Sequence, residues 1–213
     1  MLLLDSANPE EARRAATLGY VHGATTNPLL IARSGMSGRA VIEALLAALP
    51  GPVFYQPVAD RVDAMVAEGR HILALAPDRV VLKLPCTPAG LAAGAALRNH
   101  AIFSVTAVFT PAQAIVAAAV GARYIIPYLS RLNRAAGNGA AVIEQMAAVA
   151  GEADLLVASL KSVDEAVRAR RAGARHLTLP LSLLEEMAVS PLTELVVEEF
   201  RRAGARVDEA AAR

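Results

Sequence analysis

The chain has 213 residues, of which 55% are hydrophobic, 19% are charged and 4% are aromatic. This composition excludes an intrinsically disordered chain, which combines low hydrophobicity with high net charge. The 21 basic and 20 acidic side chains leave a formal charge of +1, so the sequence lacks the basic excess of a protein that binds a nucleic-acid backbone. The length fits a single domain, for which about 150 residues is a common size.

Three further features limit the class of protein. The single cysteine, Cys86, excludes an intramolecular disulfide and a cysteine-rich metal site, and no metal-ligand spacing is visible. Residues Met1–Asp5 become acidic before the apolar core of a signal peptide is formed. The uncharged stretch Ala101–Ala122 is long enough to span a bilayer, but Thr110 and Pro111 within it are typical of a helix start. We interpret it as a buried strand and a buried helix, and we expect a cytoplasmic protein without membrane or nucleic-acid partners.

In the first half of the chain, short apolar runs typical of strands alternate with helical patterns. Most of the helical patterns follow Asn-Pro or Thr-Pro, pairs that commonly start a helix. In order, we expect the strand Leu2–Leu4, a helix from Asn8 to about Leu18, the strand Tyr20–Ala24, a helix from about Gly38 to Leu49, the strand Val53–Tyr55, a helix from Asp60 to about Leu75, the strand Val80–Leu84, a helix from Thr87 to about Leu97, the strand Ile102–Val108 and a helix from Thr110 to Gly121.

The alternation continues through the second half. In order, we expect the strand Tyr124–Tyr128, a Gly/Asn loop, a helix from about Gly139 to Ala150, the strand Leu155–Ala158, a helix from Ser162 to the residue before Gly173, the strand His176–Leu179 and a short helix from Ser182 to about Met187. Ser190 and Pro191 then begin a final helix, at about 191–204, whose apolar residues fall near one face.

Eight strands rich in Val, Ile and Leu that alternate with helices predict a parallel sheet covered by helices. Eight such units are the number that closes a (β/α)8 barrel. An open doubly wound sheet is the alternative, but no glycine-rich dinucleotide fingerprint follows the first strand. We therefore predict an α/β fold in which residues 1–213 form a single TIM-barrel domain with an additional C-terminal helix.

Polar side chains stand where seven consecutive strands end. In barrels of this kind the active site lies at the carboxyl ends of the strands, so these side chains are expected to face one mouth. The alternative is that polar loops simply begin there. In order, the residues are Asp5, Thr25-Thr26-Asn27, Gln56, Lys83, Thr106, Tyr128 with Arg131, and Ser159 with Lys161.

Lysine usage draws attention to two of these residues. Among the 21 basic residues the lysines are Lys83 and Lys161, and the other basic residues are arginines. Arginine stays protonated, whereas a desolvated lysine can lose its proton and attack a carbonyl. Lys83 lies in the apolar stretch Val80–Pro85, where burial lowers the pKa of its ammonium and favours Schiff-base chemistry. The alternative is a lysine that extends to the mouth or pairs with Asp5.

Arg131, Ser159 and Lys161 indicate a different role. Two cations and a hydroxyl at neighbouring strand ends are suited to holding a phosphate, which many barrels bind near their seventh and eighth strands. The alternative is a solvated basic rim.

Several stretches, in this order, resemble the short transaldolase-like family that includes fructose-6-phosphate aldolase. The resemblance covers nearly the whole chain. It implies a (β/α)8 fold and Schiff-base chemistry on the dihydroxyacetone unit of sugar phosphates, without metal or cofactor. The stretches are Leu4-Asp5, Ala24-Thr25-Thr26-Asn27-Pro28, Val81-Leu82-Lys83-Leu84-Pro85, Thr87 with Gly90-Leu91, Val105-Thr106-Ala107-Val108-Phe109, Pro127-Tyr128-Leu129-Ser130-Arg131, Ala158-Ser159-Leu160-Lys161 and Leu177-Thr178-Leu179-Pro180.

The resemblance also implies a role for each matching residue. Lys83 would form the Schiff base with the C2 ketone of a ketose phosphate, and Asp5 would handle the C4 hydroxyl proton during carbon–carbon cleavage. Asn27, beside Thr26, would bind the substrate hydroxyls. The water used in dehydration and enamine protonation would be held by Gln56, Thr106 and Tyr128. The distal phosphate would be bound by Arg131, Ser159 and Lys161.

Two positions favour one activity of the family. Its transaldolases usually have Glu where this chain has Gln56 and Phe where it has Tyr128, and a tyrosine hydroxyl can donate toward the enamine carbon. The resemblance therefore favours an aldolase that forms and cleaves fructose 6-phosphate from dihydroxyacetone and glyceraldehyde 3-phosphate. The alternatives are a transaldolase, which converts sedoheptulose 7-phosphate and glyceraldehyde 3-phosphate to erythrose 4-phosphate and fructose 6-phosphate, and a non-catalytic sugar-phosphate-binding barrel.

Two positions depart from the family pattern. Asn133 stands where an acidic residue is common, and Pro57 removes a backbone donor beside the expected water site. The resemblance further implies a homo-oligomer, a decamer built from pentameric rings, in which the helix at about 191–204 reaches a neighbouring subunit.

Overall fold

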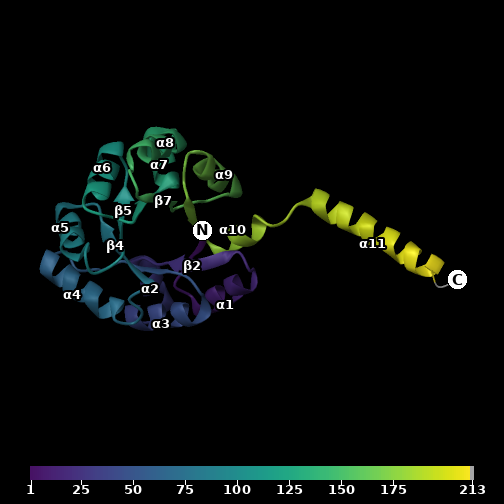
Figure 1. Cartoon of the computed structure of the whole chain (residues 1–213), viewed down its shortest axis with the longest axis horizontal. Coiled ribbons are helices and arrows are strands. Elements are labelled where there is room, and N and C mark those ends of the chain that lie inside the picture. The colour runs from purple at the N-terminus through teal and green to yellow at the C-terminus, as the bar shows by residue number, and fades with distance from the viewer. Residues whose placement is uncertain (212–213) are drawn as a thin grey trace.

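The computed structural model describes residues 1–211 and shows a closed barrel of eight parallel strands in chain order, which confirms the predicted TIM barrel (Figure 1). The strands are β1 (Leu2–Asp5), β2 (Val21–Thr25), β3 (Val53–Tyr55), β4 (Val80–Pro85), β5 (Phe103–Val108), β6 (Tyr124–Pro127), β7 (Asp154–Val157) and β8 (His176–Leu179). Parallel pairing of β1 with β8 closes the sheet on itself. The last two residues of the predicted domain, 212–213, lie outside the described residues.

Helices surround the barrel on its outer side, except the last one, which extends away from it (Figure 1). They are α1 (Pro9–Thr17), α2 (Pro28–Ser34), α3 (Gly38–Ala48), α4 (Val62–Leu73), α5 (Pro88–Leu97), α6 (Pro111–Ala119), α7 (Leu129–Ala136), α8 (Gly139–Val149), α9 (Val163–Arg171), α10 (Leu181–Glu186) and α11 (Pro191–Ala211). The predicted starts at Asn-Pro and Thr-Pro are confirmed in α1, α5 and α6, where the Asn or Thr side chain accepts a hydrogen bond from a backbone N–H of the first turn.

Two helices were not predicted. α2 begins at Pro28 and ends before Gly35, whose left-handed backbone (φ 69°) suits glycine. α7 occupies the first part of the segment predicted as a Gly/Asn loop, and Leu129 and Leu132 are its buried apolar side chains. Gly137 then separates α7 from α8. Other boundaries moved by a few residues: α4 begins at Val62 and not at Asp60, and α11 continues to Ala211.

Alternation along the strands separates two apolar layers. Successive strand residues point to opposite faces, so every second residue faces the barrel interior. One buried cluster fills that interior and contains Leu3, Phe54, Val81, Ile126 and Leu156, while the larger cluster packs between strands and helices. Asp5, Gln56, Lys83 and Tyr128 each follow one of these interior residues by two positions. The apolar layer inside the barrel therefore lies directly beneath the predicted site residues, which occupy the carboxyl ends of the same strands.

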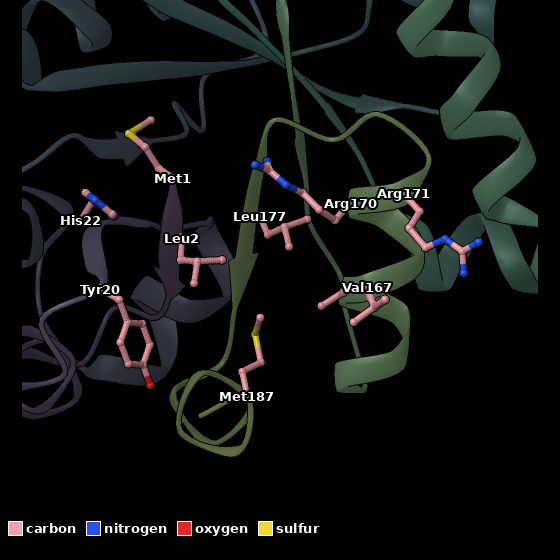
Figure 2. A pocket seen from close by; sticks show the side chains of 10 residues that line it. Met1, Leu2, Tyr20, His22, Val167, Arg170, Arg171, Leu177 and Met187 are labelled. Carbon is pink, nitrogen blue, oxygen red and sulfur yellow. The ribbon is translucent and has the colours of Figure 1, made fainter. Parts of the chain in front are cut away.

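The outer face of β1 and β8 is covered less completely than the rest of the barrel. α10 has six residues, and beside it lies a cavity of about 490 Å³ whose lining includes Leu2, Leu177, Val167 and Met187 (Figure 2). α11 does not fill this cavity but extends away from the barrel (Figure 1). Over residues 191–204, where the side chains of α11 are described, large apolar side chains are exposed, among them Leu192, Leu195, Val196, Val197 and Phe200.

Among the residues that the structure describes, no helix has both the length and the apolar character needed to cross a membrane. The uncharged stretch at Ala101–Ala122 folds as β5 and α6. The strand is buried as predicted, but the prediction of a buried helix is wrong: α6 buries Ala114 and Ala117 against the barrel and exposes Ile115 and Val116 on its outer face.

Gly90 of α5 permits a close contact at the end of β4. A Cβ atom at this position would lie 2.0 Å from the carbonyl oxygen of Pro85, which is backbone and cannot rotate away. We predict that Gly90→Ala lowers the free energy of unfolding by about 1–3 kcal/mol, as overpacking commonly does. Chemical denaturation measures this, with Gly204→Ala as the control, because a Cβ at Gly204 would meet nothing within 4 Å. A variant as stable as the parent chain would contradict the predicted clash.

Candidate active site

Lys83 lies on β4, and its side chain is 3% exposed, as the apolar strand predicts. Its Nζ donates a hydrogen bond to the main-chain carbonyl of Thr26 at 2.7 Å. Burial lowers the pKa of Lys83 to about 8, and the nearby Asp5 carboxylate opposes part of this shift. The amine is therefore neutral at pH 7 more often than the amine of an exposed lysine.

Asp5, the last residue of β1, belongs to a chain of hydroxyl contacts. Thr25 Oγ1 donates to Asp5 Oδ1 at 3.0 Å and also lies 2.7 Å from Thr178 Oγ1. Burial raises the pKa of Asp5, against the opposing effects of Lys83 and the Thr25 hydrogen bond. A carboxyl group held in one orientation, with a raised pKa, is suited to exchanging a proton with a substrate.

Thr106 and Tyr128 are brought together by β5 and the residue after β6. Their hydroxyl oxygens are 2.8 Å apart. The Tyr128 ring packs edge-on against Phe109, with centroids 5.7 Å apart, and the Arg131 guanidinium lies 5.3 Å from the centre of the same ring. Burial raises the pKa of Tyr128, so its phenol stays protonated and able to donate.

Backbone strain occurs at two places on this rim. Ala107 and Ser159 are the non-glycine residues with positive φ, at 60° and 59°, among the described part of the chain. Ala107 lies next to Thr106 in a register shift between β5 and β6. Left-handed backbone at non-glycine residues is costly and clusters at functional sites, so both positions are consistent with a site at this end of the barrel.

Thr26 and Asn27 form hydrogen bonds that stabilise the fold next to the candidate site. The Thr26 hydroxyl donates to the carbonyl of Phe54 at 2.8 Å, so Thr26 faces Lys83 through its carbonyl and not through its hydroxyl. Asn27 Oδ1 accepts from the Leu30 N–H at 3.0 Å and caps α2. That bond uses the amide oxygen and leaves the Nδ2 group for other partners.

The three residues predicted to bind phosphate occupy different surroundings. Arg131 packs on Tyr128, and the carbonyl of Ser159 accepts from the N–H of Ser130 at 3.1 Å. Lys161 is exposed and lines a cavity of about 580 Å³ together with Asp5 and Arg33. The structure thus places Arg131 beside Tyr128, and it places Lys161 in the same cavity as Asp5.

Gln56 follows β3 and lies in the wall of another cavity, of about 690 Å³, at the ends of β2, β3 and β4. Pro28, Pro57 and Pro85 also line it. Gln56 is half-buried and Pro57 is buried, so the proline that departs from the family pattern does not project into solvent.

Asn133, the other departure, has a structural partner. Its Nδ2 donates to Glu165 Oε1 at 3.0 Å, and its Oδ1 accepts from the Gly139 N–H at 2.9 Å. Glu165 Oε2 in turn accepts from the N–H of Lys161 at 2.7 Å. The amide therefore connects the α7–α8 loop to the backbone that carries Lys161.

Sequence reasoning missed three residues near the site. Thr178 orients Thr25 and hence Asp5, Arg33 shares the cavity of Asp5 and Lys161, and Glu68 binds the loop that carries Gln56. A hydroxyl inside the apolar strand β8 was the one available signal for Thr178. The positions of Arg33 and Glu68 depend on how helices pack on the barrel.

The fold places this chain among the (β/α)8 barrels, and comparison with solved structures agrees. A putative phosphonomutase from Burkholderia cenocepacia superposes with a TM-score of 0.64 at 16% identity, over 96% of this chain and 93% of that one. An inosine 5′-monophosphate dehydrogenase from Legionella pneumophila gives 0.61 at 13% identity, over 85% of this chain and 58% of that one. At these identities the likeness concerns the fold alone.

Sequence comparison identifies the family. The family model described as transaldolase/fructose-6-phosphate aldolase matches residues 2–213. A probable transaldolase of Aquifex aeolicus is 35% identical over 211 residues, which cover 97% of each chain. A probable transaldolase of Geobacter sp. is 35% identical over 92% of this chain and 94% of its own length. The chain belongs to the transaldolase/fructose-6-phosphate aldolase family and is an enzyme of that family, which confirms the resemblance.

The influence of Asp5 on Lys83 is testable by amine labelling. The Asp5 carboxylate raises the pKa of Lys83, so Asp5→Asn should lower that pKa further. We predict that the pH midpoint for labelling Lys83 with a small electrophile shifts to lower pH in this variant. Peptide mass spectrometry measures it, and Asp63→Asn, which removes an exposed carboxylate, is the control. A midpoint that stays or moves upward would show that Asp5 does not act on the amine.

Proposed function

We propose that this enzyme cleaves and forms ketose phosphates through a Schiff base on Lys83. The observation that carries the proposal is a buried amine, with a pKa lowered to about 8, in the same barrel mouth as a carboxyl group whose pKa is raised. This combination supplies a nucleophile for the C2 ketone and a proton acceptor for the C4 hydroxyl. The reaction needs no metal or cofactor.

Cleavage then follows from the placement of these groups. The neutral Lys83 amine adds to the ketone, and loss of water gives an iminium ion. Asp5 takes the C4 hydroxyl proton while the C3–C4 bond breaks, and the electron pair of that bond moves toward the iminium nitrogen. An aldose phosphate leaves, and a three-carbon enamine stays bound to Lys83.

The fate of the enamine decides between the two activities of the family. In the aldolase reaction, C3 takes a proton and water adds to C2, so that free dihydroxyacetone leaves and the Lys83 amine is restored. The protonated Tyr128 hydroxyl and its Thr106 partner support this route, as does the neutral side chain at Gln56. We therefore propose fructose 6-phosphate as the product formed from dihydroxyacetone and glyceraldehyde 3-phosphate.

A transaldolase is the second candidate, and the names of the relatives favour it. In that reaction the enamine from sedoheptulose 7-phosphate attacks glyceraldehyde 3-phosphate before water can intervene, and the products are erythrose 4-phosphate and fructose 6-phosphate. Both candidates use Lys83 and Asp5 in the same way. In both, we assign the substrate hydroxyls to Asn27 and the distal phosphate to Arg131, Ser159 and Lys161.

We also propose that the enzyme is a homo-oligomer, a pentamer or decamer, in which α11 packs on a second copy. Leu192, Leu195, Val196, Val197 and Phe200 of α11 are exposed in one copy, and the cavity beside the short α10 exposes an apolar surface. Arg170 and Arg171 border that cavity (Figure 2). On α11, Glu194 lies beside the apolar residues, whereas Glu198 pairs with Arg201 and Arg202 of the same helix. The apolar surface of the cavity therefore suits the apolar face of a helix from another subunit.

Trapping of the covalent intermediate tests the proposed nucleophile. With fructose 6-phosphate and cyanoborohydride, peptide mapping should find a reduced three-carbon or six-carbon adduct on Lys83. Lys83→Arg should form no adduct and should lose roughly 10³–10⁶-fold in activity, as nucleophile removal does elsewhere.

Analysis of the products separates the two activities. Free dihydroxyacetone would identify the aldolase, and sedoheptulose 7-phosphate formed with erythrose 4-phosphate would identify the transaldolase. If the protein binds the ligand but forms no adduct, the result would favour a non-catalytic barrel that binds sugar phosphates.

Light scattering tests the proposed assembly. We predict a mass that is five or ten times 22.2 kDa for the full chain, and a much smaller species for a chain shortened to residues 1–190. The shortened chain keeps every strand of the barrel, so circular dichroism should show that it stays folded. A full-length mass near 22.2 kDa would contradict the proposal.

A further inference from the structure

Glu68 of α4 binds the chain on both sides of Gln56. Its Oε1 accepts a hydrogen bond from the Tyr55 hydroxyl at 2.7 Å. The N–H of Val58 lies 3.1 Å from each carboxylate oxygen, and the N–H of Ala59 lies 3.0 Å from Oε2. One carboxylate thus holds the residue before Gln56 and the two residues after Pro57.

The loop between β3 and α4 relies on the Glu68 carboxylate because its own residues form few hydrogen bonds that would fix its conformation. The segment between β3 and α4 has no regular secondary structure, and Pro57 has no N–H to donate. α4 also begins without a side-chain cap at Arg61, unlike α2, α5 and α6, whose capping Asn or Thr stands directly before them. Hydrogen bonds to a charged carboxylate are stronger than neutral ones, so Glu68 is the main polar anchor of this segment.

The anchor is itself held in place. The Tyr55 side chain is buried, and its ring leaves little room beside Gly38 of α3, where a Cβ would lie 3.0 Å from Cε2. Glu68 lies one residue before Gly69, which packs against Leu82 on β4, the strand of Lys83. The carboxylate therefore connects the Gln56 loop to β3 through Tyr55, and the next residue of the same helix packs on β4.

We propose that Glu68 is a positioning residue, which holds Gln56 at the mouth and so controls how the enamine divides between protonation and transfer. The proposal rests on the proposed function, in which Gln56 helps to hold the water that protonates and hydrolyses the enamine. Glu68 does not touch the reacting atoms. Its effect should therefore appear in the water-dependent step and not in Schiff-base formation.

Three substitutions separate charge, length and position. Glu68→Gln keeps the size of the side chain but replaces one acceptor oxygen by an NH2 donor, which faces the N–H donors of Val58 and Ala59. Glu68→Asp keeps both acceptors on a side chain shorter by one methylene, so it should recover part of the function. Glu43→Gln is the control, because Glu43 is a half-exposed carboxylate on α3 that pairs with Arg39.

The experiment measures both fates of the enamine from fructose 6-phosphate. Dihydroxyacetone release reports hydrolysis, and sedoheptulose 7-phosphate formed with erythrose 4-phosphate reports transfer. For Glu68→Gln we expect the cyanoborohydride adduct on Lys83 to stay within twofold of the parent enzyme. We expect the ratio of hydrolysis to transfer to fall about tenfold, which is less than the roughly 10²–10⁴-fold contribution of a direct acid–base group, because Glu68 acts only through the position of Gln56. Glu68→Asp should lie between the two, and Glu43→Gln should match the parent.

A double-mutant cycle shows whether Glu68 acts through Gln56. If it does, Gln56→Ala alone should lower the ratio, and adding Glu68→Gln should lower it no further. Independent, additive losses would overturn the proposal, as would equal losses of both products or an unchanged ratio. Should Glu68→Gln fail to fold, Glu68→Asp and Tyr55→Phe test the same anchor with smaller changes. Absence of any Lys83 adduct in the parent enzyme would overturn the proposed function itself.

Discussion

The desolvation of one amine is the constraint on which this site depends. Lys83 is enclosed by an apolar strand, and its direct polar partner is the Thr26 carbonyl, which stabilises a proton on Nζ but carries no net charge. A buried lysine that forms an ion pair with a carboxylate keeps its proton. A buried ammonium without any hydrogen-bond partner has a very high desolvation cost. The arrangement lies between these limits, and it lowers the pKa of the Lys83 amine to about 8.

The barrel provides this environment through the alternation of its strands. Interior residues such as Leu3, Val81 and Ile126 form an apolar floor, and the residues two positions further along the same strands form the site above it. Because neighbouring strands are in register, Asp5 on β1 and Thr25 on β2 pair directly. The same regularity places the Thr106 and Tyr128 hydroxyls at hydrogen-bond distance. Closure of the sheet between β1 and β8 then adds Thr178 to the hydroxyl chain.

Much of this architecture was predictable because its signals are local. Apolar runs, capping pairs such as Thr87-Pro88 and polar strand ends each involve a few neighbouring residues. The features that escaped prediction depend on contacts between distant elements. α7 presents two buried leucines in an otherwise polar segment, too few for a clear helical pattern. Glu68 meets the Gln56 loop from the second turn of α4, a contact that no sequence spacing specifies. The chemical roles of the site residues stay predictions that assays must test.

The presence of two lysines in the chain allows the state of the central amine to be measured directly. In protein labelled with 13C-lysine, NMR titration follows each amine separately, and Lys83→Arg identifies the signal of Lys83. A Lys83 signal that titrates near pH 8 would agree with the desolvated amine described above. A signal that titrates near the ordinary lysine value of about 10.4 would contradict it.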